Sequence, residues 1–262
     1  NRDNIGDEAK QALRDALPDW SNTALEREID RHYAPYWQGL HLGTHVMFAK
    51  LLEGMQDDQV RIDLQPESAR DATRVCFAIV DHPGVFSRFA GALALIGANV
   101  VDARLFTSKD GYATAVFWIQ DAEGSPYSAT RLPRLQKMIT QILSGKVLTT
   151  EAIKDRDRVK KRERAFEVPT SITFDNDGSE IYTIIEVDTR DRPGLLFDLT
   201  QTMAQANIYI ASSVVATYGE QVVDSFYVKD MFGLKFHSKA KQKSIEKRLR
   251  AAITAGRERA AS

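Results

Sequence analysis

Residues 191–230 read DRPGLLFDLTQTMAQANIYIASSVVATYGEQVVDSFYVKD, and residues 81–121 read DHPGVFSRFAGALALIGANVVDARLFTSKDGYATAVFWIQD. Both stretches begin with Asp-x-Pro-Gly, 110 residues apart (191 − 81). An apolar, β-branched run precedes each motif, and apolar residues at spacings of three and four follow it. This pattern predicts a strand, a tight turn and a helix in each copy.

The remainder of each copy predicts two more strands and a final helix. Asn99 and Asn207 end the two first helices, and an apolar strand pattern follows each of them. A four-stranded split β-α-β sheet needs one further strand. Val60–Leu64 and Ser171–Phe174 precede the two copies at matching distances, because Ile62 and Ile172 again differ by 110 positions. We therefore predict an α+β fold with two ferredoxin-like modules, each ββαββα with an antiparallel four-stranded sheet and two helices.

The predicted domain organisation has four parts. Residues 1–56 carry helical patterns and are expected to be the helical remnant of an upstream region, residues 57–145 form the first module, and residues 166–262 form the second. Residues 146–165 are rich in charge and are expected to be a linker, helical at least in part. Because the chain starts at Asn1 rather than at Met, we expect it to be a fragment of a longer protein.

Composition excludes several functional classes. With 35 basic and 36 acidic residues, the net charge of −1 argues against a nucleic-acid or anionic-membrane binder. No apolar run has the length of a transmembrane helix. The single cysteine, Cys76, rules out a disulfide framework and suits a reducing, cytoplasmic location.

The Asp-x-Pro-Gly turns have the chemistry of an anion site. Proline fixes φ near −65°, and glycine allows a ligand to approach the backbone. The helix that starts next leaves its first N–H groups unpaired and carries a partial positive charge, which favours a carboxylate. Asn99 and Asn207 offer both a donor and an acceptor nearby. These features suit an α-amino acid. The alternative is that Asp81 and Asp191 only cap their helices.

In these residues the chain resembles the ACT domain, a ligand-binding module of many amino-acid-regulated enzymes. The tandem, the intervening FEVPTSITFDNDGSEIYTIIEV and the lead-in HYAPYWQGLHLGTHVMFAKLL more specifically resemble the C-terminal region of the bifunctional uridylyltransferases that modify the nitrogen-regulatory PII protein. The resemblance covers essentially the whole chain.

The resemblance implies two ligand sites. The first is expected to use Asp81, His82, Pro83, Gly84 and Val85, with Asn99 and Val100 opposite them. The second is expected to use Asp191, Arg192, Pro193, Gly194 and Leu195, with Asn207 and Ile208 opposite. Such sites lie between two copies, so we expect the modules to pair within the chain or across a homodimer. His82 stands where Arg is common, which would make the first site pH-sensitive.

The resemblance also implies a regulatory role. The ligand is expected to be glutamine, and the regulated activities are the transfer of UMP to PII and its hydrolytic removal, by magnesium-dependent domains upstream. Neither catalytic signature occurs in these residues, so we expect no catalytic residue and no cofactor here. The alternative is an ACT tandem from another amino-acid-responsive enzyme or regulator.

The sequence disfavours two other kinds of site, one for a metal ion and one for nucleic acid. His32, His41 and His45 lie close in sequence, but Gly43 interrupts the spacing and no acidic base accompanies them, so we expect no metal site. The basic stretch Lys154–Arg164 lacks interleaved aromatic residues, so we expect a solvated linker rather than a nucleic-acid site.

Overall fold

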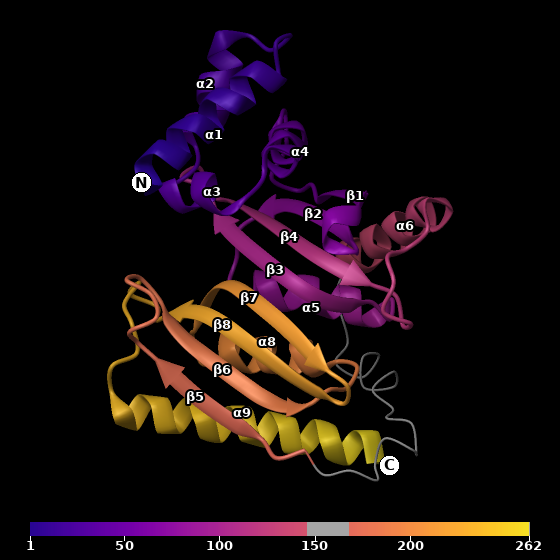
Figure 1. The fold of residues 1–262 in the computed structure, drawn as a ribbon, viewed down its shortest axis with the longest axis vertical. Coiled ribbons are helices and arrows are strands. Elements are labelled where there is room, and N and C mark those ends of the chain that lie inside the picture. The colour runs from indigo at the N-terminus through magenta and orange to yellow at the C-terminus, as the bar shows by residue number, and fades with distance from the viewer. Residues whose placement is uncertain (146–167, 262) are drawn as a thin grey trace.

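The computed structural model describes residues 1–145 and 168–261. Four helices come first: α1 (Arg2–Ala16), α2 (Asn22–Asp30), α3 (Ala34–Gly39) and α4 (Leu42–Leu52). Figure 1 shows these helices gathered at the opposite end of the molecule from the long C-terminal helix. The predicted linker 146–165 lies outside the described residues, so the domain boundaries drawn around it stay predictions.

Each module contains four strands and two helices in the predicted order. The first has β1 (Arg61–Glu67), β2 (Ala72–Val80), α5 (Val85–Leu95), β3 (Asn99–Thr107), β4 (Tyr112–Gln120) and α6 (Leu132–Ser144), with short 3-10 helices at Ser68–Arg70 and Ala129–Arg131. The second has β5 (Ser171–Asp175), β6 (Thr183–Arg190), α8 (Leu195–Gln205), β7 (Tyr209–Tyr218), β8 (Gln221–Lys229) and α9 (Lys239–Ala261).

The strand that precedes each repeat completes its sheet, as predicted. β1 pairs antiparallel with β2, with Ile62 opposite Phe77, and β5 pairs antiparallel with β6, with Ile172 opposite Val187. Ile172 and Val187 lie 110 residues after Ile62 and Phe77, which is the offset that also separates the two Asp-x-Pro-Gly motifs. The spatial orders β1-β2-β4-β3 and β5-β6-β8-β7 are those of a ferredoxin-like sheet. The predicted α+β fold class is confirmed.

The two sheets join edge to edge into one eight-stranded sheet. β3 pairs antiparallel with β7 through Asp102, Ala103 and Arg104, which lie opposite Val214, Ser213 and Ser212. Helix α5 packs against α8 on the same side of this seam. Figure 1 shows the first module above the second, with β3 and β7 facing each other. The expected pairing of the modules therefore occurs within one chain.

The sheet of the first module is covered on both faces. On one face, Phe77 and Phe117 belong to a core that extends through the helices of both modules. On the other face, Cys76 and Trp118 pack with Trp37 and other residues of the N-terminal helices. Alternation along β2 and β4 produces this division, because successive side chains point to opposite faces.

The second module is covered on one face only within the described residues. On β8, Val222, Phe226 and Val228 are buried toward the helices, whereas the alternating Val223 and Tyr227 are only partly buried. No buried apolar cluster of the described residues covers that second face. Among residues 1–145 and 168–261, no helix is long and apolar enough to cross a membrane.

Candidate ligand-binding cavities between the modules

The two Asp-x-Pro-Gly turns adopt the same backbone conformation. Gly84 and Gly194 have φ of 79° and 77°, the left-handed region that favours glycine, and each immediately precedes its helix. The backbone N–H of Asp81 donates to the carbonyl of Gly111 at 2.9 Å, and that of Asp191 donates to Glu220 at 2.8 Å. Both turns are thus held against the hairpin that follows them in sequence.

In the first turn, the aspartate binds a neighbouring strand rather than the helix. Within the described residues, neither α5 nor α8 receives a hydrogen bond from the side chain of its N-cap residue, which is glycine in both. Asp81 instead accepts a hydrogen bond from the hydroxyl of Thr107 at 3.3 Å. The structure thus shows Asp81 bound to Thr107 rather than capping α5. The first N–H of each helix, on Val85 and on Leu195, donates within the turn to the carbonyl of His82 at 3.2 Å and of Arg192 at 3.3 Å, so only the N–H groups that follow can serve another acceptor.

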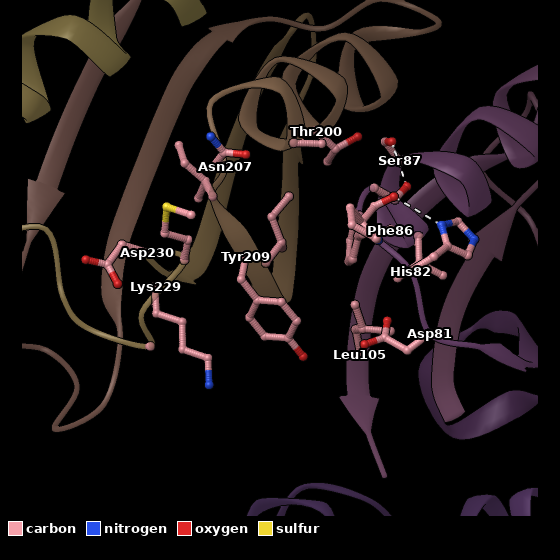
Figure 2. Close-up of a pocket in the computed structure, with 18 residues that line it drawn as sticks. Asp81, His82, Phe86, Ser87, Leu105, Thr200, Asn207, Tyr209, Lys229 and Asp230 are labelled. Carbon is pink, nitrogen blue, oxygen red and sulfur yellow. Dashed lines mark hydrogen bonds between the residues drawn. The ribbon is translucent and has the colours of Figure 1, made fainter. Parts of the chain in front are cut away.

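The first turn lines a cavity of about 670 Å³ between the modules, here called the first cavity. One wall comes from the first module and carries Asp81, His82, Phe86 and Leu105. The other wall comes from the second module and carries Asn207, Tyr209, Lys229 and Asp230. Figure 2 shows these two sets of side chains on opposite sides of the open space.

A chain of hydroxyl groups connects the two walls of the first cavity. The Tyr209 hydroxyl lies 3.2 Å from the hydroxyl of Thr107, which in turn donates to Asp81. Burial raises the pKa of Tyr209 to about 12, so its proton is available for this contact at neutral pH. Partial burial also raises the pKa of Asp81, against the lowering effect of the Thr107 hydrogen bond. The ammonium of Lys229 lies 5.1 Å from the centre of the Tyr209 ring.

His82 is held by a contact at each of its ring nitrogens. Its Nε2 lies 3.1 Å from the guanidinium of Arg88, which can only donate, and its Nδ1 lies 3.0 Å from the carbonyl of Pro83, which can only accept. These two partners fit the tautomer that carries its proton on Nδ1. The proposed pH sensitivity of this site stays a prediction.

The second turn lines a cavity of about 480 Å³, here called the second cavity. It contains Asp191, Arg192, Gly194 and Leu195 of the second module. The facing residues come from the first module and include Asn99, Val100 and the turn Ala122–Gly124. The two cavities are thus related by the pseudo-symmetry of the modules, and each is built from both of them.

The two cavities are built crosswise, because the strand start that faces each turn belongs to the other module. This corrects the expectation that each turn faces a strand of its own module. All fourteen predicted site residues line a cavity, but Asn207 and Ile208 face the Asp81 turn, and Asn99 and Val100 face the Asp191 turn. Each turn meets the strand start of the other module because β3 and β7 run antiparallel along the seam. The expected pairing joined each turn to a strand of its own module, because no local pattern in the sequence encodes how the two modules dock.

An ion-paired arginine anchors the second turn. The Arg192 guanidinium donates to Asp198 at 2.6 Å, and Arg259 of α9 donates to the same carboxylate at 2.8 Å. A Cβ placed on Gly256 would lie 1.7 Å from Nη2 of Arg192, so the glycine of α9 makes room for this side chain. Arg192 and His82 occupy the same place in the two turns but bind different partners, which makes the two cavities chemically distinct.

Several cavity residues were not identified from the sequence. Tyr209 and Lys229 look like ordinary strand residues, and only the docked modules bring them to the first cavity. Asp224, which lines the second cavity, did leave a signal. It is the single charged residue at the buried positions Val222, Asp224, Phe226 and Val228 of β8.

Two histidines of the N-terminal helices, His32 and His45, serve packing, whereas His41 is exposed. His32 stacks on Tyr36 with ring centroids 3.7 Å apart and contacts Glu28 at 2.7 Å. His45 donates to the carbonyl of Tyr36 at 2.9 Å, and burial lowers the pKa of His45 to about 4. Among the described residues, no group of three or more potential ligands is arranged to hold a metal ion.

Comparison with known proteins identifies the modules. The family described as "ACR9-like, ACT-like domain" matches residues 171–256. The second module belongs to this ACT-like family, and the first repeats its fold. The first ACT module shares the strand order, the turn and the helix placement of the matched one.

The whole ACT tandem is also similar to curated enzymes. The bifunctional uridylyltransferase/uridylyl-removing enzyme of Cereibacter sphaeroides is 65% identical over 99% of this chain, and that of Ruegeria pomeroyi is 64% identical over 100%. The enzyme of the same name from Rhodospirillum rubrum is 39% identical over 94%. The resemblance to this enzyme family is confirmed. The chain spans 28%, 29% and 27% of the lengths of these three relatives.

Solved structures add less to the ACT assignment. The aspartate kinase from Synechocystis matches 69% of this chain and 27% of its own, at 15% identity and a TM-score of 0.35. A similarity at that level supports no argument about the function of this chain.

Proposed function

We propose that this ACT tandem is a sensor that binds an α-amino acid, glutamine, in its two inter-module cavities. Through that binding it controls the attachment and removal of UMP on the PII protein by the catalytic domains of a longer, cytoplasmic enzyme. Magnesium would serve those catalytic domains. The identity of 65% with a bifunctional uridylyltransferase/uridylyl-removing enzyme over 99% of the chain supports the choice of regulated activity.

The observation that carries the proposal is the crosswise construction of the cavities. Each cavity takes its turn from one module and its facing strand from the other. A ligand bound there contacts both modules, so its affinity depends on how the modules are docked. A ligand can shift a conformational equilibrium only by such a difference in affinity. The cavities therefore have the property that a regulatory site requires.

The chemistry of the cavities suits an amino acid. The N–H groups that follow Val85 in α5 and Leu195 in α8, together with the partial positive charge at each helix start, favour the ligand's carboxylate. Carboxyl groups of Asp81 and Asp224, with the amides of Asn99 and Asn207, provide acceptors for an ammonium or a side-chain amide. Volumes of about 670 and 480 Å³ lie in the range of small-molecule sites.

The repeat offers a matched pair of blocking variants for the test. Ala204 of α8 lines the first cavity, and Ala94 of α5, at the equivalent position, lines the second. Both are partly buried, so a phenylalanine can extend into the cavity rather than into the core. Isothermal titration of the 262-residue chain with L-glutamine measures how many sites are occupied. We expect Ala204→Phe and Ala94→Phe each to remove one site and the double variant to remove both.

Two results would count against the proposal. One is an absence of heat on titration of the unmodified chain with L-glutamine and with the other amino acids. The other is binding that neither blocking variant alters, since the ligand would then lie elsewhere. In the full-length enzyme, the double variant is expected to bring the ratio of uridylyl-removing activity with and without glutamine to about 1.

A further inference from the structure

Strand β8 carries a carboxyl group where its sheet needs none. Asp224 lies opposite Val187 on the helix-facing side of the second sheet, and its side chain is 2% exposed. The equivalent residue of the first module is Ala115, which lies opposite Phe77. Since the first module closes its core with alanine at this position, the fold itself does not require an acid there.

The carboxyl group of Asp224 is also poorly compensated. Its Oδ1 is buried and has no hydrogen-bond partner within the described residues. Burial, together with the nearby charge of Asp191, raises the pKa of Asp224 to about 8. Buried polar groups normally find partners, and leaving one without a partner costs free energy. An acid kept under these conditions points to a role in binding rather than in stability.

The position of Asp224 connects it to the second cavity. It lines that cavity together with Asp191 and the N-terminus of α8, whereas Ala115 does not line the first cavity. The second cavity therefore combines a positive end, formed by the N-terminus of α8 and the guanidinium of Arg192, with the carboxyl groups of Asp191, Asp224 and Glu123. A cation placed beside these carboxyl groups would restore the ionised form of Asp224, while an anion there would be repelled.

We propose that Asp224 receives the ammonium group of a zwitterionic ligand and thereby makes the second cavity selective for ligands that carry one. The ligand's carboxylate lies at the N-terminus of α8. The first module has Ala115 at the equivalent position, so the first cavity does not select for an ammonium group in this way. The inference rests on the proposed function, because it assumes that an amino acid enters the second cavity.

The test compares ligands that differ by one group. The probes are L-glutamine, 4-carbamoylbutanoate, which lacks the α-ammonium, and L-norvaline, which lacks the side-chain amide. Affinities are measured by titration calorimetry in the Ala204→Phe background, so that only the second cavity is open. Asp224→Asn keeps the shape of the side chain and removes its charge. Asp188→Asn is the matched control, because Asp188 lies on the other face of the same sheet and binds Gln221.

We expect Asp224→Asn to weaken L-glutamine binding at least tenfold and to leave 4-carbamoylbutanoate binding nearly unchanged. Asp188→Asn should preserve the preference for L-glutamine. If Asp224→Asn instead abolishes only the preference over L-norvaline, the carboxyl group binds the side-chain amide and the inference is wrong. Unchanged L-glutamine binding in Asp224→Asn overturns it as well and leaves the proposed function standing. If the open second cavity of the parent protein binds no amino acid, both proposals fail.

A measurement without ligand separates a binding role from a structural one. Replacing Asp224 with alanine, the residue of the first module, removes a buried acid that lacks compensation. We expect Asp224→Ala to raise the melting temperature of the free protein while reducing the further rise that L-glutamine produces. A lower melting temperature in Asp224→Ala would show that the carboxyl group holds the fold together, which would contradict the inference.

Discussion

At the scale of single residues, the two turn glycines determine where the helices begin. Gly84 and Gly194 have positive φ, which side-chain-bearing residues adopt only at a cost of about 1–2 kcal/mol. The proline before each glycine fixes the approach to the turn. These are local constraints, and for that reason the Asp-x-Pro-Gly motifs were recognisable in the sequence.

A glycine substitution tests this constraint. Gly194→Ala should lower the free energy of unfolding by about 1–2 kcal/mol, because alanine is strained at φ 77°. Gly6→Ala is the matched control within α1, where the added Cβ would make an ordinary 3.8 Å contact with Trp37. It should raise stability by about 0.5–1 kcal/mol through helix propensity. Urea denaturation measures both, and a stabilising Gly194→Ala would contradict the assigned turn conformation.

At the scale of elements, the seam between β3 and β7 is short. It contains three residue pairs, so contacts beside it contribute to holding the modules together. The Tyr209 hydroxyl of β7 reaches Thr107 at the end of β3, and through it Asp81 of the turn. This contact connects the docking of the modules to the geometry of the first cavity.

Removing one hydroxyl group tests the importance of that contact. Tyr209→Phe should lower the free energy of unfolding by about 1 kcal/mol, the typical value of a buried hydrogen bond, and should weaken ligand binding in the first cavity only. Tyr227→Phe is the control on the neighbouring strand, since within the described residues that hydroxyl makes no hydrogen bond; it should change stability by less than about 0.5 kcal/mol. Equal effects of the two variants in urea denaturation would argue against a linking role for Tyr209.

At the scale of the whole molecule, the described residues form two large, separate cores beside a small cluster of Leu52, Met55 and Ala78. One lies on the helix-covered side of the sheet and extends through both ACT modules, and the other lies between the N-terminal helices and the first module. Cys76 belongs to the second of these cores, and burial raises the pKa of its thiol to about 12. The folded protein should therefore react very slowly with thiol reagents at pH 8, since the thiolate is the reactive form.

Cys76 can report on the core beneath the N-terminal helices. Trp37→Ala should cost about 3–5 kcal/mol, because the side chain is 2% exposed, and it should accelerate labelling of Cys76 by a disulfide reagent. Leu249→Ala removes a fully buried side chain from the other core and is the control. We expect it to accelerate labelling much less than Trp37→Ala. Equal acceleration would mean that the two cores open together as a single unit.

Much of the architecture followed from short stretches of sequence. Apolar periodicity, the proline and glycine of each turn and the constant offset between repeats were enough for the strand order and for the strand that precedes each repeat. The resemblance to the ACT domain supplied the fourteen predicted site residues, all of which line the cavities. The short helix α3 was not predicted, because its local signal is weak and its position depends on packing against α1.

The cavities themselves were decided by tertiary packing. Which strand faces which turn depends on the edge-to-edge docking of β3 and β7, a contact between residues more than a hundred positions apart that no local pattern encodes. The same docking brings Tyr209 and Lys229 to the Asp81 turn and leaves Asp224 beside the Asp191 turn. Backbone conformation depends on near neighbours and can therefore be inferred along the chain. A binding site between two modules depends on how their surfaces fit, and only the folded molecule contains that information.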